Sequence, residues 1–565
     1  MKMNFKGLKR TCALSLATVF LATTTFAGPA FAANTGVASS AAGAATTTSA
    51  IQVPALSQGA LKEAAAAGVY YIQPLTGGAS RFVNNAGGYT FVIPAGMQVT
   101  DMSHSSLVSV FEDEHRHLEV YTGYPVAGYT GYGYKFLENT QDHTNIYQST
   151  TTIAGHTAYV KQWERRKLSK IKNDHNYYAS VTIMAGAKVY DFFFTSDRPF
   201  WEIGGYLDIA KSFTSFAPTS AGYDAKSRLV ASLKWNEETN KFFEQYFGKD
   251  SSLRWGMYNR FYSWKKDDLK AKEEQIGYKF PILLHYTALR PDLASYVSGV
   301  TYLLDTAYED GRTIELTLQT PLGAGGPNRI YRILEGEFDG FLHDYAKAIA
   351  KFGHPVLFRL FNEMNGDWCD YSAYYTSRDP EMFKAAYRYI YSIFEEEGAN
   401  ANTIWIWNPN AGSFPNFMWN DQRCYYPGDE YVDVVGLTAY NTGTYYKGET
   451  WKSFNACYYD VYTQMAKYYT QPMMITEFSC ASCGGDKVSW VKNMFYYIKA
   501  YDKIKLAVWW DGCDWDAAGN IARSYFIDDP KELLDVFSHY LAPDENEAAT
   551  DSAIKAGPVT LRESK

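Results

Sequence analysis

Long apolar runs are missing from the sequence once the first 22 residues are passed. No later segment reaches the roughly 18 consecutive apolar residues that a membrane-spanning helix needs. Clusters of positive charge are also scarce. The formal net charge is -8, and the one basic cluster after residue 10 is Arg165-Arg166-Lys167. Nucleic acids and anionic membranes both favour a basic patch. The sequence therefore predicts no membrane insertion and no nucleic-acid partner.

Cysteine is sparse, with 7 residues in 565, and Cys12 lies in the N-terminal segment. In an exported protein the other six permit disulfides, whose pairing the sequence leaves open, and free buried thiols are the alternative. The pair Cys480-x-x-Cys483 has no second CxxC motif and no neighbouring His, so we predict no metal site and no cofactor. The six residues are Cys369, Cys424, Cys457, Cys480, Cys483 and Cys513.

The N-terminus has the pattern of a signal peptide over residues 1–32. Basic residues up to Arg10 precede an apolar stretch from residue 12 to residue 22, and Ala30-Phe31-Ala32 supplies the small residues of a cleavage site. Residues 33–66 are rich in Ala, Ser and Thr without periodicity, which indicates a linker. We therefore expect a secreted, extracellular protein.

Aromatic residues are abundant at 17%, with 47 Tyr and 14 Trp. Flat amphipathic rings suit the faces of sugars, since C–H groups pack on the ring while hydroxyls reach outward. A Tyr-rich surface without ligand function explains the composition equally well at this stage.

Residues 67–218 show the period-two alternation of β-strands separated by turn residues. Candidate strands include segments 88–94 and 156–163, and a short helix is predicted over 206–213. The pattern predicts a small α+β accessory domain dominated by antiparallel sheet, whose function is not written in its residues.

Residues 219–541 repeat a strand, a loop and a helix, which predicts a parallel sheet. No GxGxxG follows the first strand, so a (β/α)8 barrel is favoured over a doubly wound open sheet. Residues 542–565 are polar and aperiodic, which indicates a disordered tail. The predicted strands are 254–258, 280–285, 314–320, 356–361, 404–407, 432–437, 473–476 and 505–510.

Two carboxylates fall at the ends of predicted barrel strands. Glu363 follows the fourth strand, and Glu477 ends the seventh. Catalytic residues of β/α barrels lie at the C-terminal ends of the strands. Glycoside hydrolysis requires one carboxyl that protonates the leaving oxygen and another that meets the oxocarbenium-like carbon. The pair therefore predicts a glycosidase active site.

The motif around these residues resembles glycoside hydrolase family 26 of clan A. The resemblance rests on Phe358-Arg359-x-x-Asn362-Glu363-Met364-Asn365-Gly366-x-Trp368 and on Met474-Ile475-Thr476-Glu477-Phe478, and it covers residues 235 to 541. It implies a retaining β-glycanase with Glu363 as acid/base and Glu477 as nucleophile. It also implies that Tyr440 hydrogen-bonds the nucleophile and that Trp510 floors the subsite of the attacked sugar.

The same resemblance places Arg359 beneath the carboxylates, where a cation helps keep Glu477 ionised. The chain departs from the mannanase branch, which commonly has His before the acid/base, because Asn362 stands there. In clan A an Asn at this position contacts the 2-hydroxyl of the attacked sugar. The departure favours β-glucan or β-xylan over mannan, although Asn also suits an axial hydroxyl.

Further candidates for the substrate cleft are Trp368, His285 and Asn408. A structural role is equally open for His285, which ends the predicted second strand, and for Asn408 at the rim of the fifth. Trp509 and Trp510 alternate in direction, and we predict that Trp510 faces the site.

These observations predict a monomeric, secreted endo-β-glycanase that retains configuration and acts on β-1,4-mannan or mixed-linkage β-glucan. A non-catalytic extracellular polysaccharide-binding protein is the alternative from another class. A transglycosylase acting on an exopolysaccharide would use the same residues, and the sequence does not separate it from a hydrolase.

Overall fold

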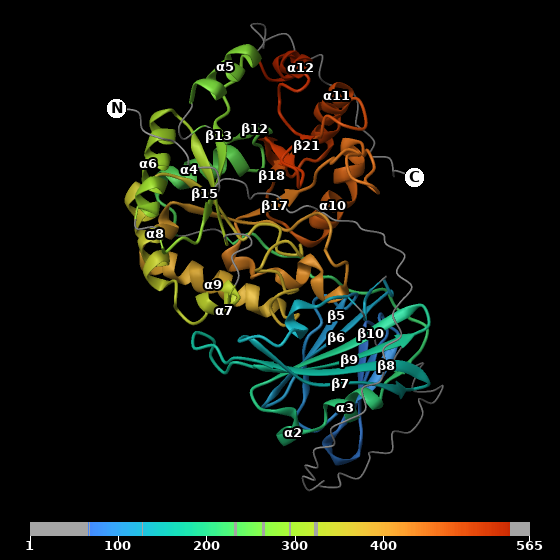
Figure 1. Cartoon of the computed structure of the whole chain (residues 1–565). Helices are drawn as coiled ribbons and strands as arrows, with labels where there is room; N and C mark the ends of the chain where they lie inside the picture. Colours follow the sequence, from blue (N-terminus) through green and yellow to red (C-terminus); the bar gives the residue numbers. More distant parts are fainter. Residues whose placement is uncertain are drawn as a thin grey trace.

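The computed structural model describes residues 66, 68–126, 128–130, 132–230, 234–260, 262, 266–292, 295–320 and 326–542. The predicted signal peptide, nearly all of the predicted linker and the predicted tail beyond residue 542 lie outside these residues. The described chain forms an antiparallel sheet domain followed by a closed parallel barrel (Figure 1).

The sheet domain contains two antiparallel sheets, with strand orders β1-β2-β3-β11 and β4-β5-β6-β10-β9-β8-β7. Alternate residues of the central strands pack into one apolar cluster that includes Phe111, Val160, Val181 and Phe192. Two short helices, α2 (Phe200–Ile203) and α3 (Tyr206–Lys211), follow β10. The strands are β1 (Tyr70–Pro74), β2 (Ser80–Asn84), β3 (Tyr89–Ile93), β4 (Gln98–Asp101), β5 (Val108–Glu112), β6 (Arg116–Gly123), β7 (His143–Ile153), β8 (His156–Arg165), β9 (Tyr177–Ala185), β10 (Lys188–Ser196) and β11 (Thr214–Ser215).

The second domain is a barrel in which each strand pairs in parallel with the next and β19 pairs with β12. The helices lie around it (Figure 1). The barrel strands are β12 (Arg254–Asn259), β13 (Ile282–Ala288), β14 (Thr313–Gln319), β15 (Val356–Leu360), β16 (Thr403–Trp407), β17 (Val434–Thr438), β18 (Met473–Phe478) and β19 (Ile504–Asp511). The helices are α4 (Glu237–Phe247), α5 (Lys266–Ile276), α6 (Tyr296–Glu309), α7 (Arg329–Ile333), α8 (Asp339–Phe352), α9 (Pro380–Glu396), α10 (Phe454–Tyr468), α11 (Lys487–Tyr497) and α12 (Glu532–Leu541).

Alternation along the strands sorts the barrel side chains into two cores. Leu284, Ile406 and Val508 belong to an interior cluster, which four aromatic residues of α4 close at one end of the barrel. The intervening residues, such as Leu283 and Trp405, pack outward against the helices. Because the period of a strand is two, this sorting decides which residue types reach the rim of the barrel interior.

The sheet domain and the barrel share one continuous apolar core. Tyr121, Trp163 and Phe193 of the sheet domain belong to the same cluster as Phe417 and Trp419 of the barrel. Strands β5 and β6 lie near the barrel helices α7 and α9 in Figure 1. Buried side chains therefore pack the two domains directly against each other.

The fold prediction is confirmed: an eight-stranded parallel barrel follows a mainly antiparallel domain. All eight predicted barrel strands overlap observed ones. Strand β7 was not predicted, because its residues are mostly exposed and polar and lack apolar alternation.

Candidate active site

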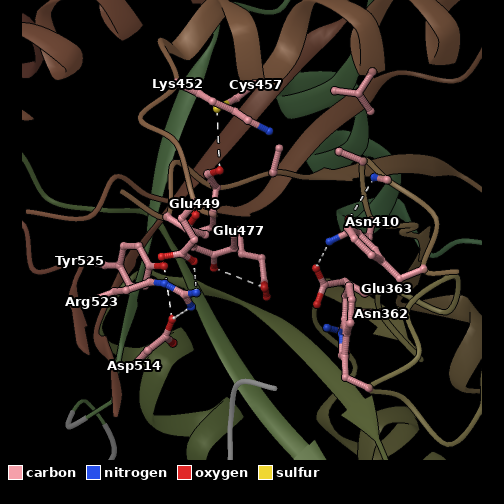
Figure 2. A pocket seen from close by; sticks show the side chains of 18 of the residues that line it. Asn362, Glu363, Asn410, Glu449, Lys452, Cys457, Glu477, Asp514, Arg523 and Tyr525 are labelled. Carbon is pink, nitrogen blue, oxygen red and sulfur yellow. Dashed lines mark hydrogen bonds and ion pairs between the residues drawn. The ribbon is translucent and has the colours of Figure 1, made fainter. Parts of the chain in front are cut away.

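A cavity of about 590 Å³ opens at the C-terminal ends of the barrel strands. Glu363 and Glu477 both line it, and their carboxyl groups point toward one another across it (Figure 2). Aromatic and amide side chains from the loops after β15 and β16 line it, as do charged side chains from the loops after β17 and β19. Tyr286 of β13 and Cys457 of α10 line it too. The loop residues of the lining include Asn362, Trp368, Tyr371, Asn410, Phe414, Tyr440, Glu449, Lys452, Asp514, Arg523 and Tyr525.

Glu363 is fixed by an unusual backbone at the end of β15. Its φ is 58°, and that of Phe361 is 51°, so two residues with side chains adopt the left-handed region. Non-glycine residues rarely adopt this region, and such strain clusters at functional sites. The Glu363 amide donates to the Asn408 carbonyl at 2.7 Å. The conformation turns the side chain from the strand end into the cavity.

The environment of Glu363 favours its protonated form. Burial and then the negative charge of Glu477 raise the pKa of Glu363 to about 7. Hydrogen bonds from the Asn410 amide, at 2.5 Å to Oε1, and from Trp368 oppose this increase. Burial disfavours a charged carboxylate, and a second carboxylate nearby adds to the effect. Glu363 can therefore hold a proton near neutral pH and release it within the same pH range.

A β-bulge points Glu477 into the barrel. Leu437 pairs with Ile475, but the next residue, Thr438, pairs with Glu477, so Thr476 is an extra residue in β18. Met474 faces the interior, and Ile475 and Phe478 face the helices. Strict alternation would have turned Glu477 toward the helices, because a bulge shifts the facing of every later residue.

Three side chains hold the Glu477 carboxylate. The Arg359 guanidinium donates to Oε2 at 2.8 Å, and the Tyr286 hydroxyl also donates to Oε2. The Tyr440 hydroxyl donates to Oε1 at a longer 3.3 Å. The two oxygens are therefore unequal, with Oε2 held by a cation and a phenol and Oε1 held more weakly.

Arg359 lies fully buried below the cavity between two carboxyl groups. Besides Glu477, its Nε lies 3.3 Å from Oε1 of Glu315, a fully buried residue of β14. Burial raises the pKa of Glu315 to about 8, and the charge of Glu477 adds to the increase. A protonated Glu315 leaves the charge of Arg359 available to Glu477. The Thr317 hydroxyl and the Asn408 amide oxygen accept the remaining hydrogen bonds of Arg359, at 2.8 Å and 3.2 Å.

The two sides of the cavity differ in chemistry. On one side, Trp368 packs against Phe414 with ring centroids 5.3 Å apart, beside Asn362 and Asn410. On the other side, Arg523 of the hairpin β20 (Cys513–Trp515) and β21 (Ile521–Ser524) donates to Asp514 at 2.7 Å and also to Glu449. Figure 2 shows this ionic cluster facing Asn410 and Glu363 across the cavity. One side suits the apolar face of a sugar ring, and the other presents polar groups to hydroxyls.

The structure brings most of the predicted site residues together. Glu363, Glu477, Asn362, Tyr440 and Trp368 line the cavity. Arg359 lies beneath them in contact with Glu477, as the resemblance implies.

Three predicted residues are not in the cavity lining. His285 does not end its strand, since β13 continues to Ala288, and it lies on the opposite face from Tyr286. Asn408 is fully buried and donates to the Thr438 hydroxyl at 3.1 Å. Trp510 faces the barrel interior, whereas Trp509 packs outward against Phe537. Trp510 is 3% exposed and stacks on Tyr258 at 5.2 Å, so its ring packs within the barrel interior.

Sequence reasoning missed Tyr286, Asn410, Glu315 and Arg523. Tyr286 and Asn410 each lie within two residues of a predicted candidate, and correct strand facing would have identified Tyr286. Glu315 lies in the middle of an apolar strand, where a carboxylate is itself a signal. Arg523 lies on an insertion after β19 with no motif that marks it.

The six cysteines that follow the signal segment are free thiols in the structure, so the disulfide alternative does not apply there. Cys369 and Cys457 border the cavity. Within the described ranges, no three His, Cys, Asp or Glu side chains are grouped as metal ligands. No helix in that same part of the chain is long and apolar enough to span a bilayer.

A β/α barrel with two buried carboxyls facing each other at the strand ends is an arrangement typical of glycoside hydrolases. Residues 327–478, which include both glutamates, match the family described as Glycosyl hydrolase family 26. The match covers the barrel strands β15 to β18 and the loops between them.

Two relatives illustrate the likeness. Endoglucanase H of Acetivibrio thermocellus is 29% identical over 245 residues, which cover 43% of this chain and 26% of that protein. A mannan endo-1,4-beta-mannosidase of Bacillus subtilis is 33% identical over 106 residues, which cover 18% of this chain and 28% of that protein. The matched segments thus span little more than a quarter of either relative. Among solved structures, the catalytic domain of a Bacillus sp. JAMB-750 endo-beta-1,4-mannanase aligns with a TM-score of 0.43 at 18% identity, covering 56% of this chain and 92% of that one.

Proposed function

We propose that the protein is a secreted, retaining endo-β-glycanase that hydrolyses β-1,4-mannan or a mixed-linkage β-glucan by double displacement. The observation that carries the proposal is the pair of glutamates on one cavity, one protonated near pH 7 and the other held by Arg359. The family match over residues 327–478 and the names of the relatives, an endoglucanase and a mannanase, support this substrate class.

In the first step, Oε1 of Glu477 attacks the anomeric carbon, because Oε2 is occupied by Arg359 and Tyr286. A bond forms between Oε1 and the anomeric carbon as the bond to the leaving oxygen breaks. Glu363 gives its proton to that oxygen, so the shortened chain leaves as an alcohol. The product is a glycosyl ester on Glu477 with inverted configuration.

In the second step, Glu363 acts as a base. Esterification removes the negative charge of Glu477, which helps to raise the pKa of Glu363. The pKa of Glu363 therefore falls once the ester forms, and the carboxylate accepts a proton from water. The water oxygen bonds to the anomeric carbon, and Glu477 leaves as a carboxylate, which restores the original configuration. The loss of the negative charge of Glu477 on esterification thus allows Glu363 to act as an acid in the first step and as a base in the second.

The substrate is expected to lie across the cavity with a sugar face on Trp368 and hydroxyls toward Arg523 and Asp514. Asn362 is 5% exposed and next to the proton donor, where it can contact the 2-hydroxyl of the attacked sugar. This contact is the reason to include β-glucan beside mannan. No metal or cofactor takes part in the proposed steps, and a monomer suffices because one chain supplies all the groups named.

The test compares wild type with Glu363→Ala and Glu477→Ala on mannan, lichenan, cellulose and xylan, with new reducing ends as the readout. Removal of the acid should lower kcat by about 10²- to 10⁴-fold on these polymers. Removal of the nucleophile should be more severe, at about 10⁴-fold or more. Wild-type rates in either variant would contradict the assignment.

Azide separates the two roles. With an activated aryl glycoside of the responding sugar, azide should rescue Glu363→Ala and give the β-glycosyl azide, since the ester on Glu477 still forms. The smaller side chain in Glu477→Ala should admit azide directly and give the α-glycosyl azide. The opposite pattern would exchange the two roles. No hydrolysis of any of the polymers would favour the polysaccharide-binding alternative.

A further inference from the structure

A segment of the sheet domain between β6 and β7 reaches the loop that carries Trp368. The Tyr132 hydroxyl donates to the Asp367 carboxylate at 2.6 Å. The Tyr132 ring packs edge-on against Tyr374 at 5.4 Å and against Phe417 at 5.5 Å. These contacts come from a domain whose function the sequence left open, and they end one residue from the cavity.

Trp368 connects this contact to the proton donor. It follows Asp367 directly, lines the cavity, and donates a hydrogen bond to Glu363. Its ring is wedged between Phe414 and Gly366, where a Cβ on the glycine would come within 2.5 Å of the indole. The indole therefore has little room, and a shift of Asp367 moves the group that contacts Glu363.

The barrel loop is anchored to the sheet domain at other points as well. The Tyr374 hydroxyl donates to the Gly133 carbonyl, and Tyr129 packs on Phe417 of the neighbouring loop after β16 at 4.6 Å. Farther along, Arg378 forms a buried ion pair with Asp191 of β10. Of these contacts, the Tyr132–Asp367 hydrogen bond lies nearest in sequence to a residue of the cavity.

We propose that Tyr132 is a positioning residue of the active site, acting through Asp367 and Trp368 on the proton donor Glu363. The sheet domain then completes the catalytic unit rather than serving only as a detachable accessory. The inference rests on the proposed glycanase function for its kinetic consequences. The expected change in the pKa of Glu363 does not depend on substrate and can be measured on the free protein.

The groups around Glu363 allow the direction of that effect to be stated. Glu477 on β18 raises its pKa, whereas Arg359 on β15 and the hydrogen bonds from Asn410 and Trp368 lower it. The thiol of Cys369 and the hydroxyls of Tyr371 and Tyr440 also face Glu363 and stay neutral because burial raises their pKa values. Loss of Tyr132 changes only the Trp368 contribution, so it should raise the pKa of Glu363.

The experiment uses the full chain and single-residue variants of it. Tyr132→Phe removes the hydroxyl and keeps the ring. Tyr178→Phe is the control for interface stability, because it removes a second Tyr–Asp hydrogen bond across the same interface, 2.8 Å to Asp379 just before α9 and away from the cavity. It also removes the hydrogen bond that Arg165 donates to the Tyr178 hydroxyl at 2.9 Å. Gly366→Ala is the positive control, since its new Cβ displaces the Trp368 indole directly.

We expect Tyr132→Phe and Gly366→Ala to lower kcat/KM by about tenfold, since small misplacements of a catalytic group are costly. The alkaline limb of kcat/KM should move to higher pH in both. Tyr178→Phe should lower the melting temperature without changing kcat/KM or the pH of its alkaline limb. Asp367→Asn, which keeps an acceptor for Tyr132, should retain the wild-type pH profile.

Carbon NMR titration of the glutamate carboxyls, with Glu363 assigned by Glu363→Gln, measures the same pKa without substrate. A higher pKa in Tyr132→Phe than in wild type and Tyr178→Phe supports the inference even if no polysaccharide is cleaved, in which case only the proposed function fails. An unchanged pKa in Tyr132→Phe, beside a raised one in Gly366→Ala, overturns it. Equal kinetic effects of Tyr132→Phe and Tyr178→Phe also overturn it, since they would indicate general stability.

Discussion

Glu363 and Glu477 have the same side chain and opposite surroundings. Glu477 accepts hydrogen bonds from Arg359, Tyr286 and Tyr440. Glu363 accepts hydrogen bonds from the neutral side chains of Asn410 and Trp368, and burial with the neighbouring charge of Glu477 raises its pKa to about 7. At the residue scale, the proposed roles of the two glutamates follow from these environments, because only a group that titrates near the working pH can give and take a proton efficiently.

The first prediction concerns pH. The acid must be protonated for the first step, so kcat/KM should fall above a pKa near 7, about tenfold per pH unit. Asn410→Ala removes a hydrogen bond that lowers the pKa of Glu363, and the limb should therefore move to higher pH. Initial rates between pH 4 and 9 on the responding polysaccharide would measure the alkaline limb in wild type and its shift in Asn410→Ala. A limb that stays in place in Asn410→Ala would contradict the role of this contact.

At the scale of the elements, the hairpin β20–β21 forms one side of the cavity through a single guanidinium. Arg523 joins Asp514 of its own hairpin to Glu449 of the loop after β17. It is 3% exposed, and the Tyr525 hydroxyl donates to Asp514 at 3.3 Å. Without the guanidinium, the two carboxylates would face each other and repel, and the two loops would separate.

The second prediction is that Arg523→Ala raises KM by about tenfold or more while kcat changes less, because substrate hydroxyls lose a positioned surface remote from the reacting carbon. The melting temperature should also fall. Glu449→Gln in the same chain removes one repelling charge and should recover part of the melting temperature but not the KM. Steady-state kinetics and thermal unfolding separate these effects, and an unchanged KM in Arg523→Ala would exclude a substrate contact on this side.

On the scale of the whole molecule, a buried ion pair joins the sheet domain to the barrel. Asp191 of β10 is fully buried, where it pairs with Arg378 and accepts hydrogen bonds from Tyr129 at 2.8 Å and Thr182 at 2.9 Å. Arg378 has a left-handed φ of 60° and is 4% exposed. The barrel loop therefore carries a cation whose partner belongs to the other domain.

The third prediction is that Asp191→Ala lowers the free energy of unfolding by about 3–5 kcal/mol, because breaking a buried pair leaves an uncompensated charge. Deletion of residues 1–218 should leave Arg378 equally unpaired and yield a barrel that aggregates. Denaturant unfolding of Asp191→Ala measures the first effect. Glu138→Ala, which breaks the exposed 2.9 Å pair with Lys135, is the control and should leave stability unchanged. A deleted chain that stays folded and fully active would show that the sheet domain is only an accessory.

The sequence by itself determined the barrel and the two glutamates. Short apolar strands alternating with amphipathic helices leave few ways to bury both faces of a parallel sheet, and the strand ends of a barrel meet at one rim. Glu363 within Asn-Glu-Met-Asn-Gly and Glu477 at the end of a strand were therefore identifiable without coordinates. Arg359 was placed beneath the carboxylates only by the resemblance of its motif to family 26.

Only the tertiary structure decided which side chains face the cavity. The extra residue Thr476 turns Glu477 inward, and a shift of one residue exchanges His285 for Tyr286. The contact of Arg359 with the third carboxyl, Glu315, joins residues 44 positions apart in the chain. The contact of Tyr132 with Asp367 joins residues 235 positions apart. Facing after a bulge and long-range pairing follow from packing across the whole fold, and a local pattern does not determine them.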